Sequence, residues 1–347
     1  MSINYIVYFG FNSFNEHKRG VENVIEFQSR ALNFDGIYYV HWGSNTRVYK
    51  NGSFNCISIK NCWYWPLILN VVLFRISQRT KLFIHSHNPL FSFCSIFKTN
   101  IFTVHDGLYY MRKSKKKPIF LSYIIEKLLY YRCSIVHFIS NFAKEKSLYG
   151  NSKNYIIIPN TSHFEDFVLK NKFSQRMQQK KSILIVRSIE DRARIDLLID
   201  VAEKVINKNF QFTVAGKGPL LSYYQRQIET KGLTNIELLG YVNDADLLNL
   251  YSNCDIVLMT AQYGEGFGLP IIEGYLFNKP VIASNKCSIP EIIFSSCYLF
   301  DNTVDSIIEK INFGLKNTNN NFNFYYETKF SNKIVLDRMC KLYKTLS

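Results

Sequence analysis

The sequence of 347 residues contains no hydrophobic run long enough to cross a membrane. A membrane-spanning helix needs about 20 consecutive apolar residues. The longest apolar stretch, from Trp63 to Ile76, is shorter and is interrupted by Pro66, Asn70 and Arg75. The amino-terminus also lacks a basic segment followed by an apolar segment and a small-residue cleavage site. The sequence therefore predicts a cytoplasmic protein without a signal peptide.

Closely spaced cysteines are absent as well. The eight cysteines are scattered, and no two stand in the Cys-x-x-Cys spacing that is typical of zinc and redox centres. In a chain of this size they indicate reduced, mostly buried thiols of a cytosolic protein. His85 and His87 would share one face of a strand, but no third ligand accompanies them, so a structural role is favoured. Neither a metal nor an organic cofactor is predicted.

Acidic residues are scarce in the first half of the chain. Residues 1–181 carry 25 Lys and Arg against 9 Asp and Glu, whereas residues 182–347 carry 17 against 18. The whole net charge of +15 therefore belongs to the first half. Compositional drift would have raised both halves alike, so this asymmetry predicts an anionic partner: a membrane surface, nucleic acid or an acidic substrate.

Both halves alternate short apolar runs with helical patterns, which is typical of doubly wound α/β sheets. The strands expected in the first half are Tyr5–Phe9, Tyr38–His41, Leu82–His85, Ile101–Val104, Ile135–Ile139 and Tyr155–Ile158. Those expected in the second half are Ile183–Val186, Phe210–Ala215, Ile236–Val242 and Asp255–Thr260. The predicted organisation is an amino-terminal Rossmann-like domain at 1–163, a linker at 164–181, a second Rossmann-like domain at 182–329, and a tail helix at 330–347 that rejoins the first domain.

A glycine-rich turn, Glu265–Glu273, follows a buried strand and opens a helix. Gly266 and Gly268 lack Cβ atoms, so a ligand can approach the backbone closely. The free N–H groups at the start of the helix suit a phosphate. Other strands of the second half are followed directly by cations and glycines. These residues lie at the carboxyl ends of the strands, where open α/β sheets bind ligands. Together they predict a pyrophosphate site that contains Arg187, Arg192, Gly216 and Gly218.

Two further features lie in the first half. His105 follows a strand directly and Gly20 opens a helix after the first strand, so both lie at a carboxyl edge of the sheet. A basic run precedes an aromatic helical pattern at Ile119–Tyr131, and it comprises Arg112, Lys113, Lys115, Lys116 and Lys117. A solvated loop and a membrane-surface patch both explain this run, since basic clusters bind anionic lipid at ~1 kcal/mol per Lys or Arg.

The segment from Phe212 to Ile293 resembles the carboxyl-terminal domain of retaining GT-B glycosyltransferases of family 4. Several motifs occur in the order and spacing of that family, among them Glu265 and Glu273 with the family's separation. The likeness extends more weakly over the whole chain, through Gly20-Val21-Glu22, His105-Asp106 and Ile157–Asn160. The resemblance implies the GT-B fold, in which two Rossmann-like domains face each other across a cleft.

The resemblance also implies a role for each motif. Glu265 and the turn after it would bind the donor sugar, Glu273 the ribose, and His105 the sugar beside the reacting carbon. Arg187 and Arg192 would clamp the phosphates. The clamp of the family reads Gly-Arg…Lys-Gly, and this chain has Val186-Arg187…Arg192-Ala193 with the same five-residue spacing. Arg194 is the substitute if that loop shifts. The other implied donor contacts are Gly20, Gly216, Gly218, Tyr241, Val242, Gly266, Phe267, Gly268 and Leu269.

The expected reaction is transfer of a sugar from a UDP- or GDP-sugar, with retained anomeric configuration and without a metal. The expected acceptor is a lipid-linked oligosaccharide in surface polysaccharide synthesis, such as O-antigen or capsule. The enzyme would lie in the cytoplasm, peripheral to an anionic inner membrane face, and would not bind nucleic acid. Asp244-Ala245-Asp246 is interpreted as the cap of a helix that begins near Ala245, not as a metal motif.

Alternatives remain open. A GT-B-fold nucleotide-sugar hydrolase or epimerase would share the fold, and a hydrolase would use Glu265 and Glu273 as an acid/base pair. A non-enzymatic basic protein that binds membranes or nucleic acid would explain the charge of the first half but not the phosphate-cradling second half. A dehydrogenase is disfavoured, because Gly216-Lys217-Gly218 lacks the third glycine of the dinucleotide fingerprint.

Overall fold

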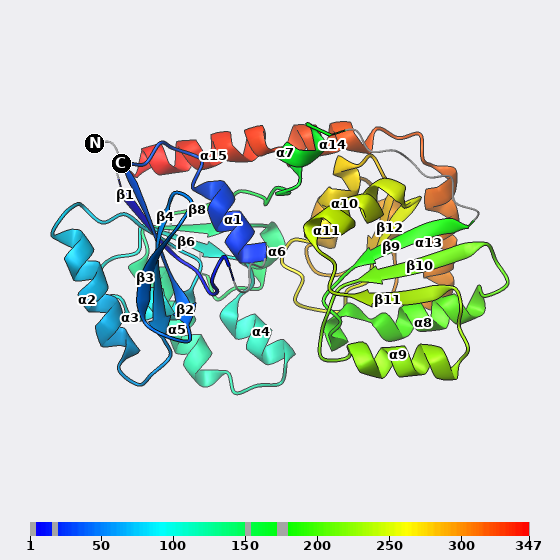
Figure 1. The fold of residues 1–347 in the computed structure, drawn as a ribbon, viewed down its shortest axis with the longest axis horizontal. Coiled ribbons are helices and arrows are strands. Elements are labelled where there is room, and N and C mark those ends of the chain that lie inside the picture. Colours follow the sequence, from blue (N-terminus) through cyan, green and yellow to red (C-terminus); the bar gives the residue numbers. More distant parts are fainter. Residues whose placement is uncertain (1–4, 16–19, 150–153, 172–179, 347) are drawn as a thin grey trace. The chain divides into compact units, whose positions relative to one another are not determined.

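A computed structural model describes residues 5–15, 20–149, 154–171 and 180–346. The chain divides into two compact units (Figure 1). Unit 1 comprises Met1–His163 and Lys333–Ser347, and unit 2 comprises Phe164–Asn332. Residues 172–179 of the expected linker, and Arg19 beside Gly20, lie outside the described residues.

Unit 1 is built on one sheet, whose described strands follow the order β3-β4-β2-β1-β5-β6-β7-β8. Neighbours are parallel except β3, which is antiparallel to β4. The strands are β1 (Tyr5–Phe9), β2 (Gly36–Gly43), β3 (Arg47–Asn51), β4 (Phe54–Lys60), β5 (Ile84–Ser86), β6 (Ile101–Val104), β7 (Ile135–Phe138) and β8 (Tyr155–Ile157). The helices are α1 (Gly20–Gln28), α2 (Trp65–Ser77), α3 (Pro89–Cys94), α4 (Leu108–Ser114), α5 (Phe120–Arg132), α6 (Asn141–Glu145) and α15 (Asn332–Thr345).

The β3–β4 hairpin was not expected from the sequence. Its first strand is a mostly exposed edge strand with no apolar run. Asn51 pairs with Phe54, so the turn between the two strands is the two-residue Gly52-Ser53, and Gly52 has a left-handed φ of 55°. A two-residue Gly-Ser connection is a hairpin signal, and it is the feature from which this hairpin could have been predicted.

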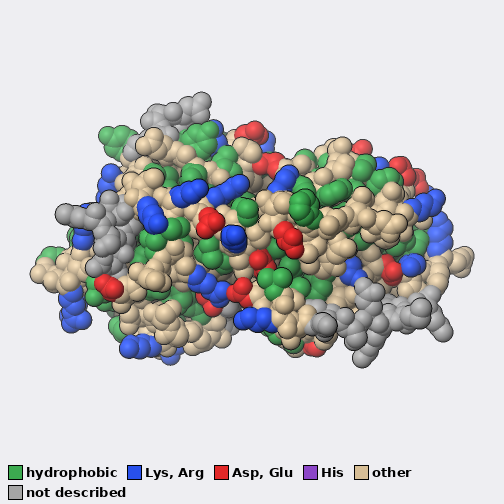
Figure 2. Space-filling view, turned by 90° about the horizontal axis from the view of Figure 1, so that it is seen from above, with side chains coloured by type: hydrophobic (Ala, Val, Ile, Leu, Met, Phe, Trp, Pro, Cys, Tyr) green, Lys and Arg blue, Asp and Glu red, His purple; other side chains and the backbone are tan. Residues whose placement is uncertain are grey.

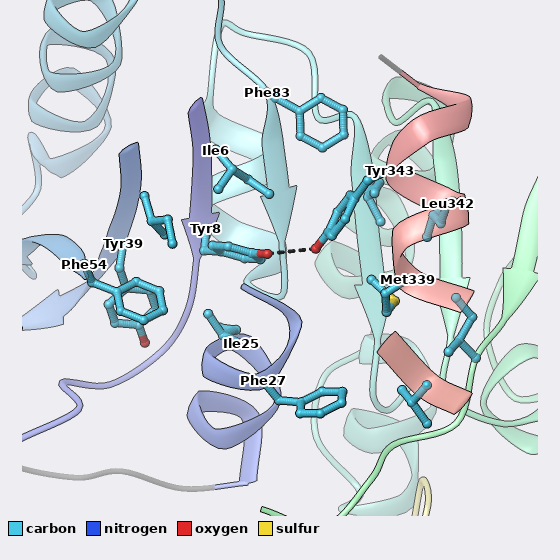
Figure 3. Close-up of a cluster of buried hydrophobic side chains, with 14 of the residues drawn as sticks. Ile6, Tyr8, Ile25, Phe27, Tyr39, Phe54, Phe83, Met339, Leu342 and Tyr343 are labelled. Carbon is cyan, nitrogen blue, oxygen red and sulfur yellow. Dashed lines mark hydrogen bonds between the residues drawn. The ribbon is translucent and has the colours of Figure 1, made fainter. Parts of the chain in front are cut away.

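The last helix completes the core of unit 1. Met339, Leu342 and Tyr343 of α15 pack in one buried cluster with residues of β1 and α1 (Figure 3). The hydroxyl oxygens of Tyr8 and Tyr343 lie 2.8 Å apart, and Nδ1 of His85 lies 2.8 Å from the Tyr343 oxygen. The final residues of the chain are therefore an integral part of this core.

The tail helix expected at 330–347 contains α15 (Asn332–Thr345). A further helix, α14 (Phe322–Lys329), which was not expected from the sequence, precedes it, and Phe330 and Ser331 form the break between the two helices. The carboxylate of Glu165 lies at the break. It accepts a hydrogen bond from the backbone N–H of Asn332 (2.6 Å) and another from the hydroxyl of Tyr326 (2.7 Å). A carboxylate at this place satisfies the first amide of α15 and stabilises the start of the helix.

Unit 2 is a second α/β unit, and its described strands are all parallel in the order β11-β10-β9-β12-β13-β14. The strands are β9 (Lys181–Val186), β10 (Phe210–Ala215), β11 (Ile236–Gly240), β12 (Ile256–Met259), β13 (Val281–Ser284) and β14 (Leu299–Phe300). The other helices are α7 (Glu165–Val168), α8 (Ile195–Lys204), α9 (Leu221–Thr230), α10 (Asp244–Asn253), α11 (Leu269–Leu276), α12 (Ile289–Ile292) and α13 (Val304–Lys316).

The strand order of unit 2 shows where a ligand would bind. The chain winds outward from β9 in one direction and then, from β12, in the other. Open α/β sheets bind ligands at this switch point, outside the carboxyl ends of the strands. Arg187 follows β9 and the glycine-rich turn follows β12. The predicted α/β class with parallel sheets in two domains is confirmed.

Unit 1 contains all seven histidines of the chain, and four of them are closely packed. Burial lowers the pKa of His137 to about 4. Burial, and then the charge of His137, lower the pKa of His105 to about 3. Burial also lowers the pKa of His85 and His87 well below the ordinary value. These side chains are neutral in the folded protein at neutral pH.

We expect unit 1 to be lost first on acidification. A histidine whose folded pKa is lowered stabilises the fold above the unfolded pKa of about 6.5, and this stability is lost as pH falls toward the folded pKa. A pKa difference of one between the folded and unfolded states corresponds to about 1.4 kcal/mol, so the loss between about pH 6.5 and pH 4 amounts to several kcal/mol. All three tryptophans, Trp42, Trp63 and Trp65, precede Phe164. Tryptophan emission should therefore change at a higher pH than the far-ultraviolet dichroism of the whole chain; coincident transitions would contradict this expectation.

Candidate functional site

Arg187 and Glu265 form an ion pair at the switch point of unit 2. Nη1 of Arg187 donates to Oε2 of Glu265, and the two side chains are 6% and 16% exposed. Nε of Arg187 is also buried, and it has no hydrogen-bond partner in the described part of the chain. A buried donor without an acceptor costs free energy. This arrangement favours an anionic ligand that accepts from the guanidinium.

Arg192 reaches the same loop from a short 3-10 helix, η1 (Asp191–Ala193). Its Nη1 donates to the carbonyl oxygen of Gly264, and its Nε lies 3.4 Å from a carboxylate oxygen of Glu190. The structure thus brings the two predicted clamp arginines to adjacent residues of one loop. Nη2 of Arg194 donates to Asp196 (3.0 Å), and its Nη1 donates to Oε1 of Gln262 (3.3 Å) at the start of the same loop.

Gly216 and Gly218 let two loops of unit 2 touch along their backbones. Gly216 has φ of 151°, and a Cβ there would lie 1.7 Å from the carbonyl oxygen of Arg187. A Cβ on Gly218 would lie 2.1 Å from the carbonyl oxygen of Ile189. The amide of Ile189 donates to the oxygen of Lys217 (3.1 Å). These glycines therefore position the loop that carries Arg187, while their contact with a donor stays a prediction.

The glycine-rich turn ends in the first turn of α11. Gly268 caps the helix with a left-handed φ of 89°, and Pro270 stands in the first turn. The amide of Ile271 donates back to the oxygen of Gly268 (3.0 Å), and proline has no N–H. The amide of Leu269 is thus placed to donate to a ligand. Phe267, by contrast, is 4% exposed, so its side chain contributes to the core and only its backbone suits a ligand.

Glu273 lies in the second turn of α11 and is buried. Oε2 of Glu273 accepts a hydrogen bond from the hydroxyl of Tyr251 on α10 (2.6 Å). Burial, and then the charge of Glu273, raise the pKa of Tyr251 well above its ordinary value, so the phenol keeps its proton. Tyr251 also stacks on Phe277, with ring centroids 5.6 Å apart. Tyr251 thus fixes the carboxylate, a role that the sequence did not reveal because an apolar helical pattern around a tyrosine predicts only core packing.

The segment after β11 combines an exposed aromatic ring with a helix cap. Tyr241 is 72% exposed, and Nζ of Lys217 lies 5.2 Å from its ring centroid. Val242 is partly buried. The cap of α10 is Asn243, whose Oδ1 accepts from the amide of Asp246 (3.0 Å). The expectation of a cap within Asp244-Ala245-Asp246 is corrected by one residue, because an asparagine precedes it.

Across the described residues, no group of three His, Cys, Asp or Glu side chains is arranged to hold a metal ion. His85 and His87 are instead bonded to protein groups. Nε2 of His85 lies 2.7 Å from Oγ1 of Thr103, and Nε2 of His87 lies 3.1 Å from Oε1 of Gln28. The interpretation of these two histidines as structural fits these partners.

His105 is oriented by a chain of hydrogen bonds in unit 1. Nε2 of His105 lies 2.8 Å from Nδ1 of His87. With Oε1 of Gln28 as acceptor, Nε2 of His87 carries its proton and Nδ1 accepts. His105 then donates from Nε2 and presents Nδ1 as an acceptor. The sequence did not reveal Gln28 or this role of His87, because the bonds join α1 to the residues that follow β5 and β6.

An apolar cavity of about 290 Å³ adjoins His105. Apolar side chains from α3, β6, α4 and α5 form most of its wall, and these include Pro89, Val104, Leu108, Met111 and Leu129. Glu126 also reaches this wall, where it accepts from the hydroxyl of Tyr130 (2.9 Å) and from the amide of Leu148 (2.8 Å). Gly20, at the start of α1, is exposed.

The basic run spans the end of α4 and the connection to α5. Arg112 and Lys113 lie in the last turn of α4. Lys113, Lys115, Lys116 and Lys117 are exposed, and Lys116 adopts a left-handed φ of 51°. This run is thus a charged surface of unit 1, close in sequence to the residues that line the cavity.

A family model matches unit 2 of the chain. Residues 168–329 match the family described as glycosyl transferases group 1. A curated relative, O-antigen chain mannosyltransferase C of Escherichia coli, is 25% identical over 159 residues, which cover 44% of this chain and 42% of that protein. The matched part of the chain spans less than half the length of each of the first curated relatives.

Solved structures match over nearly the whole chain. Sucrose-phosphate synthase from Thermosynechococcus elongatus superimposes with a TM-score of 0.80 at 14% identity and covers 99% of both chains. Anabaena HepE, in complex with UDP and glucose, gives a TM-score of 0.76 at 14% identity, with 98% of this chain and 99% of that chain covered. These likenesses establish the fold, which is that of GT-B glycosyltransferases. The chain is thus a GT-B-fold protein whose unit 2 matches the group 1 glycosyltransferase family.

Proposed function

We propose that the protein is a retaining, metal-independent glycosyltransferase that uses a nucleotide sugar, UDP- or GDP-linked, in the synthesis of a surface polysaccharide. The observation that carries this proposal is the buried Arg187–Glu265 pair at the switch point, with an unused guanidinium donor. The family match over residues 168–329 and the mannosyltransferase relative support it.

In this reaction the protein would mainly position the two substrates and stabilise the charge that develops on the departing phosphate. The bond between the anomeric carbon and the nucleotide diphosphate breaks, and negative charge develops on the departing phosphate. Arg187, Arg192 and the amide of Leu269 would stabilise that charge, since fixed donors in a water-poor site act strongly on a developing anion. Glu265 would accept hydroxyls of the donor sugar, and Glu273, fixed by Tyr251, would accept those of the ribose. Tyr241 would border the base.

For the acceptor we propose a lipid-linked oligosaccharide that is bound by unit 1. The apolar cavity beside His105 supports this proposal, because apolar walls favour an apolar group of the acceptor over a purely hydrated sugar. His105, which presents Nδ1 as an acceptor, would contact the donor sugar beside the reacting carbon. The basic run at 112–117 supports a location at the inner face of an anionic membrane.

The test is a thermal-shift screen with UDP-, GDP- and ADP-sugars, followed by product analysis with the responding donor. At 100 times its dissociation constant a ligand stabilises the folded state by about 2.7 kcal/mol, which is a readily measured shift. No response to any of these donors would contradict the proposal. Release of free sugar in the absence of every acceptor, at the rate seen in its presence, would favour the hydrolase instead.

A further inference from the structure

Unit 1 exposes an unusual number of large hydrophobic side chains on one set of helices. Trp63, just before α2, is 91% exposed, and Phe120, at the start of α5, is 78% exposed. The exposed residues between 63 and 131 are Trp63, Tyr64, Leu67, Val71, Phe74, Leu90, Ile96, Phe120, Leu121, Tyr123, Leu128 and Tyr131. Soluble proteins rarely expose so many neighbouring hydrophobic side chains unless a partner covers them.

Helix α2 carries apolar side chains on its outer side as well as on the side that packs on the core. Leu69, Leu73 and Ile76 of this helix are buried against the sheet in one cluster. Leu67, Val71 and Phe74 are exposed, and their spacing of four and three residues places them along one stripe of the helix. A helix that is apolar on its outer side as well as its inner side has a second apolar surface to cover.

Hydrogen bonds join α2, α3 and α5, which lie side by side in Figure 1. On α2, Nδ2 of Asn70 donates to the oxygen of Cys94 (3.0 Å), and its Oδ1 accepts from the amide of Ile96 (2.8 Å). At the end of α5, Arg132 donates to the oxygens of Phe93 (2.9 Å) and Ser95 (2.6 Å). The segment after α3 thus joins its two neighbours, and Ile96 is exposed between them. We name the outer surface of α2, α3, α5 and their connecting segments, which carries the twelve exposed residues, the apolar face.

The charges around the apolar face have one sign. Residues 61–135 contain eleven Lys and Arg but only two acids, Asp106 and Glu126. Glu126 is buried, so it contributes little to the surface. The exposed basic residues are Arg75, Arg79, Lys81, Lys98, Lys113, Lys115, Lys116, Lys117 and Lys127. Figure 2 views the molecule from above Figure 1, and on that side acidic and basic side chains are interspersed.

We propose that the apolar face docks unit 1 on a bilayer that contains anionic lipids, with Trp63, Leu67, Phe120 and Leu121 inserted among the acyl chains. The basic rim then lies at the headgroups, where each Lys or Arg contributes ~1 kcal/mol. Tryptophan and tyrosine favour the interface between headgroups and acyl chains. In the described part of the chain every helix is too short or too polar to cross a bilayer.

Other occupants fit the surface less well. A second copy of the chain would bring the same basic rim against itself in a two-fold interface, and like charges oppose that contact. Nucleic acid would attract the rim but would leave the aliphatic side chains of α2 in water. A bilayer alone complements both the charge and the apolar centre.

This docking mode deepens the proposed function, on which it rests for its role in the cell, because α5 belongs to both surfaces. Leu129 and Tyr130 line the cavity beside His105, whereas Leu128 and Tyr131 are exposed on the apolar face. A lipid-linked acceptor held in the bilayer would therefore lie one helix away from that cavity.

Vesicle cosedimentation of the full chain tests the docking mode. Wild type should bind vesicles of phosphatidylcholine with phosphatidylglycerol. The triple variant Leu67→Glu, Phe120→Glu, Leu121→Glu should bind at least about tenfold more weakly at both low and high salt, because it places charge among the acyl chains. Replacing Lys113, Lys115, Lys116 and Lys117 by Gln should weaken binding at low salt, and this difference should shrink in high salt, which screens the rim.

Matched controls come from unit 2. Tyr223 and Leu239 are exposed hydrophobic residues outside the apolar face, and Tyr223→Glu with Leu239→Glu should leave binding unchanged. Trp63 provides an optical readout, since insertion shifts its emission to the blue and Trp63→Phe should remove that shift while binding persists. Thermal unfolding of each variant verifies that it is folded.

Three results would overturn the docking mode: wild type that does not bind the anionic vesicles, binding that the triple Glu variant retains, or a wild-type dimer that this variant dissociates. The nucleotide-sugar screen is independent of vesicles. A donor response without vesicle binding would therefore refute the docking mode alone, whereas vesicle binding without any donor response would refute the proposed transferase.

Discussion

Glu265→Gln is expected to lower kcat/KM for sugar transfer by about 10³-fold while the protein stays folded. The amide keeps the size of the side chain and an oxygen that can accept from Nη1 of Arg187. It removes the negative charge that would strengthen hydrogen bonds from the donor's hydroxyls and hold the guanidinium in place. Initial rates with the responding nucleotide sugar, together with thermal unfolding, measure the two effects.

Glu265→Ala separates charge from pairing. It leaves Arg187 buried without its ionic partner, so it should cost stability as well as activity, by about 3–5 kcal/mol in the absence of ligand. Glu237→Gln is the matched control, because Glu237 is an exposed glutamate on the neighbouring part of the sheet, on β11. Transfer by Glu265→Gln at the wild-type rate would show that the ion pair is structural only.

Among the Gly→Ala substitutions of unit 2, Gly216→Ala should lower the free energy of unfolding most. The new Cβ would lie 1.7 Å from the backbone oxygen of Arg187, at a φ of 151° that other residues rarely adopt. A backbone atom cannot move aside as a flexible side chain can. We expect a loss of roughly 4 kcal/mol or more, together with loss of the nucleotide response, because the Arg187 loop must shift. Denaturant unfolding and the thermal-shift screen measure both.

Gly232→Ala is the control for this clash. Gly232 also has a positive φ, 60°, but a Cβ there meets nothing within 4 Å. Its expected cost is only about 1–2 kcal/mol, the ordinary penalty of a left-handed residue with a side chain. Equal losses for the two alanine variants would show that φ, and not the approach to Arg187, makes Gly216 necessary.

Much of unit 2 could be predicted because its signals are local in sequence. A buried strand that runs into Gly266, Gly268 and Pro270 specifies a strand-turn-helix passage whatever surrounds it. The five-residue spacing of Arg187 and Arg192 is likewise local. The same reasoning missed the β3–β4 hairpin of unit 1, whose edge strand has no apolar run and is marked only by its Gly52-Ser53 turn. It also missed the two short strands β13 and β14 of unit 2.

The pairings that give the candidate site its chemistry join distant positions. Arg187 meets Glu265, and Tyr251 meets Glu273, only because β9 and α10 are brought beside the loop and helix that follow β12. His87 and His105, which follow the neighbouring strands β5 and β6, are bonded to each other. Composition and periodicity do not specify which polar side chains meet, since a hydrogen bond depends on positions within a few tenths of an ångström.

The stretch from Trp63 to Ile76 shows the same division. By itself the sequence determined that this stretch is too short and too interrupted to span a membrane, and that the charge of the first half is strongly positive. Only the tertiary structure decided which of its apolar residues the sheet covers, and that α3 and α5 extend the uncovered ones into a basic-rimmed surface. Burial is a property of neighbours: Leu69 and Leu67 are the same residue type two positions apart, and packing alone makes one core and the other surface.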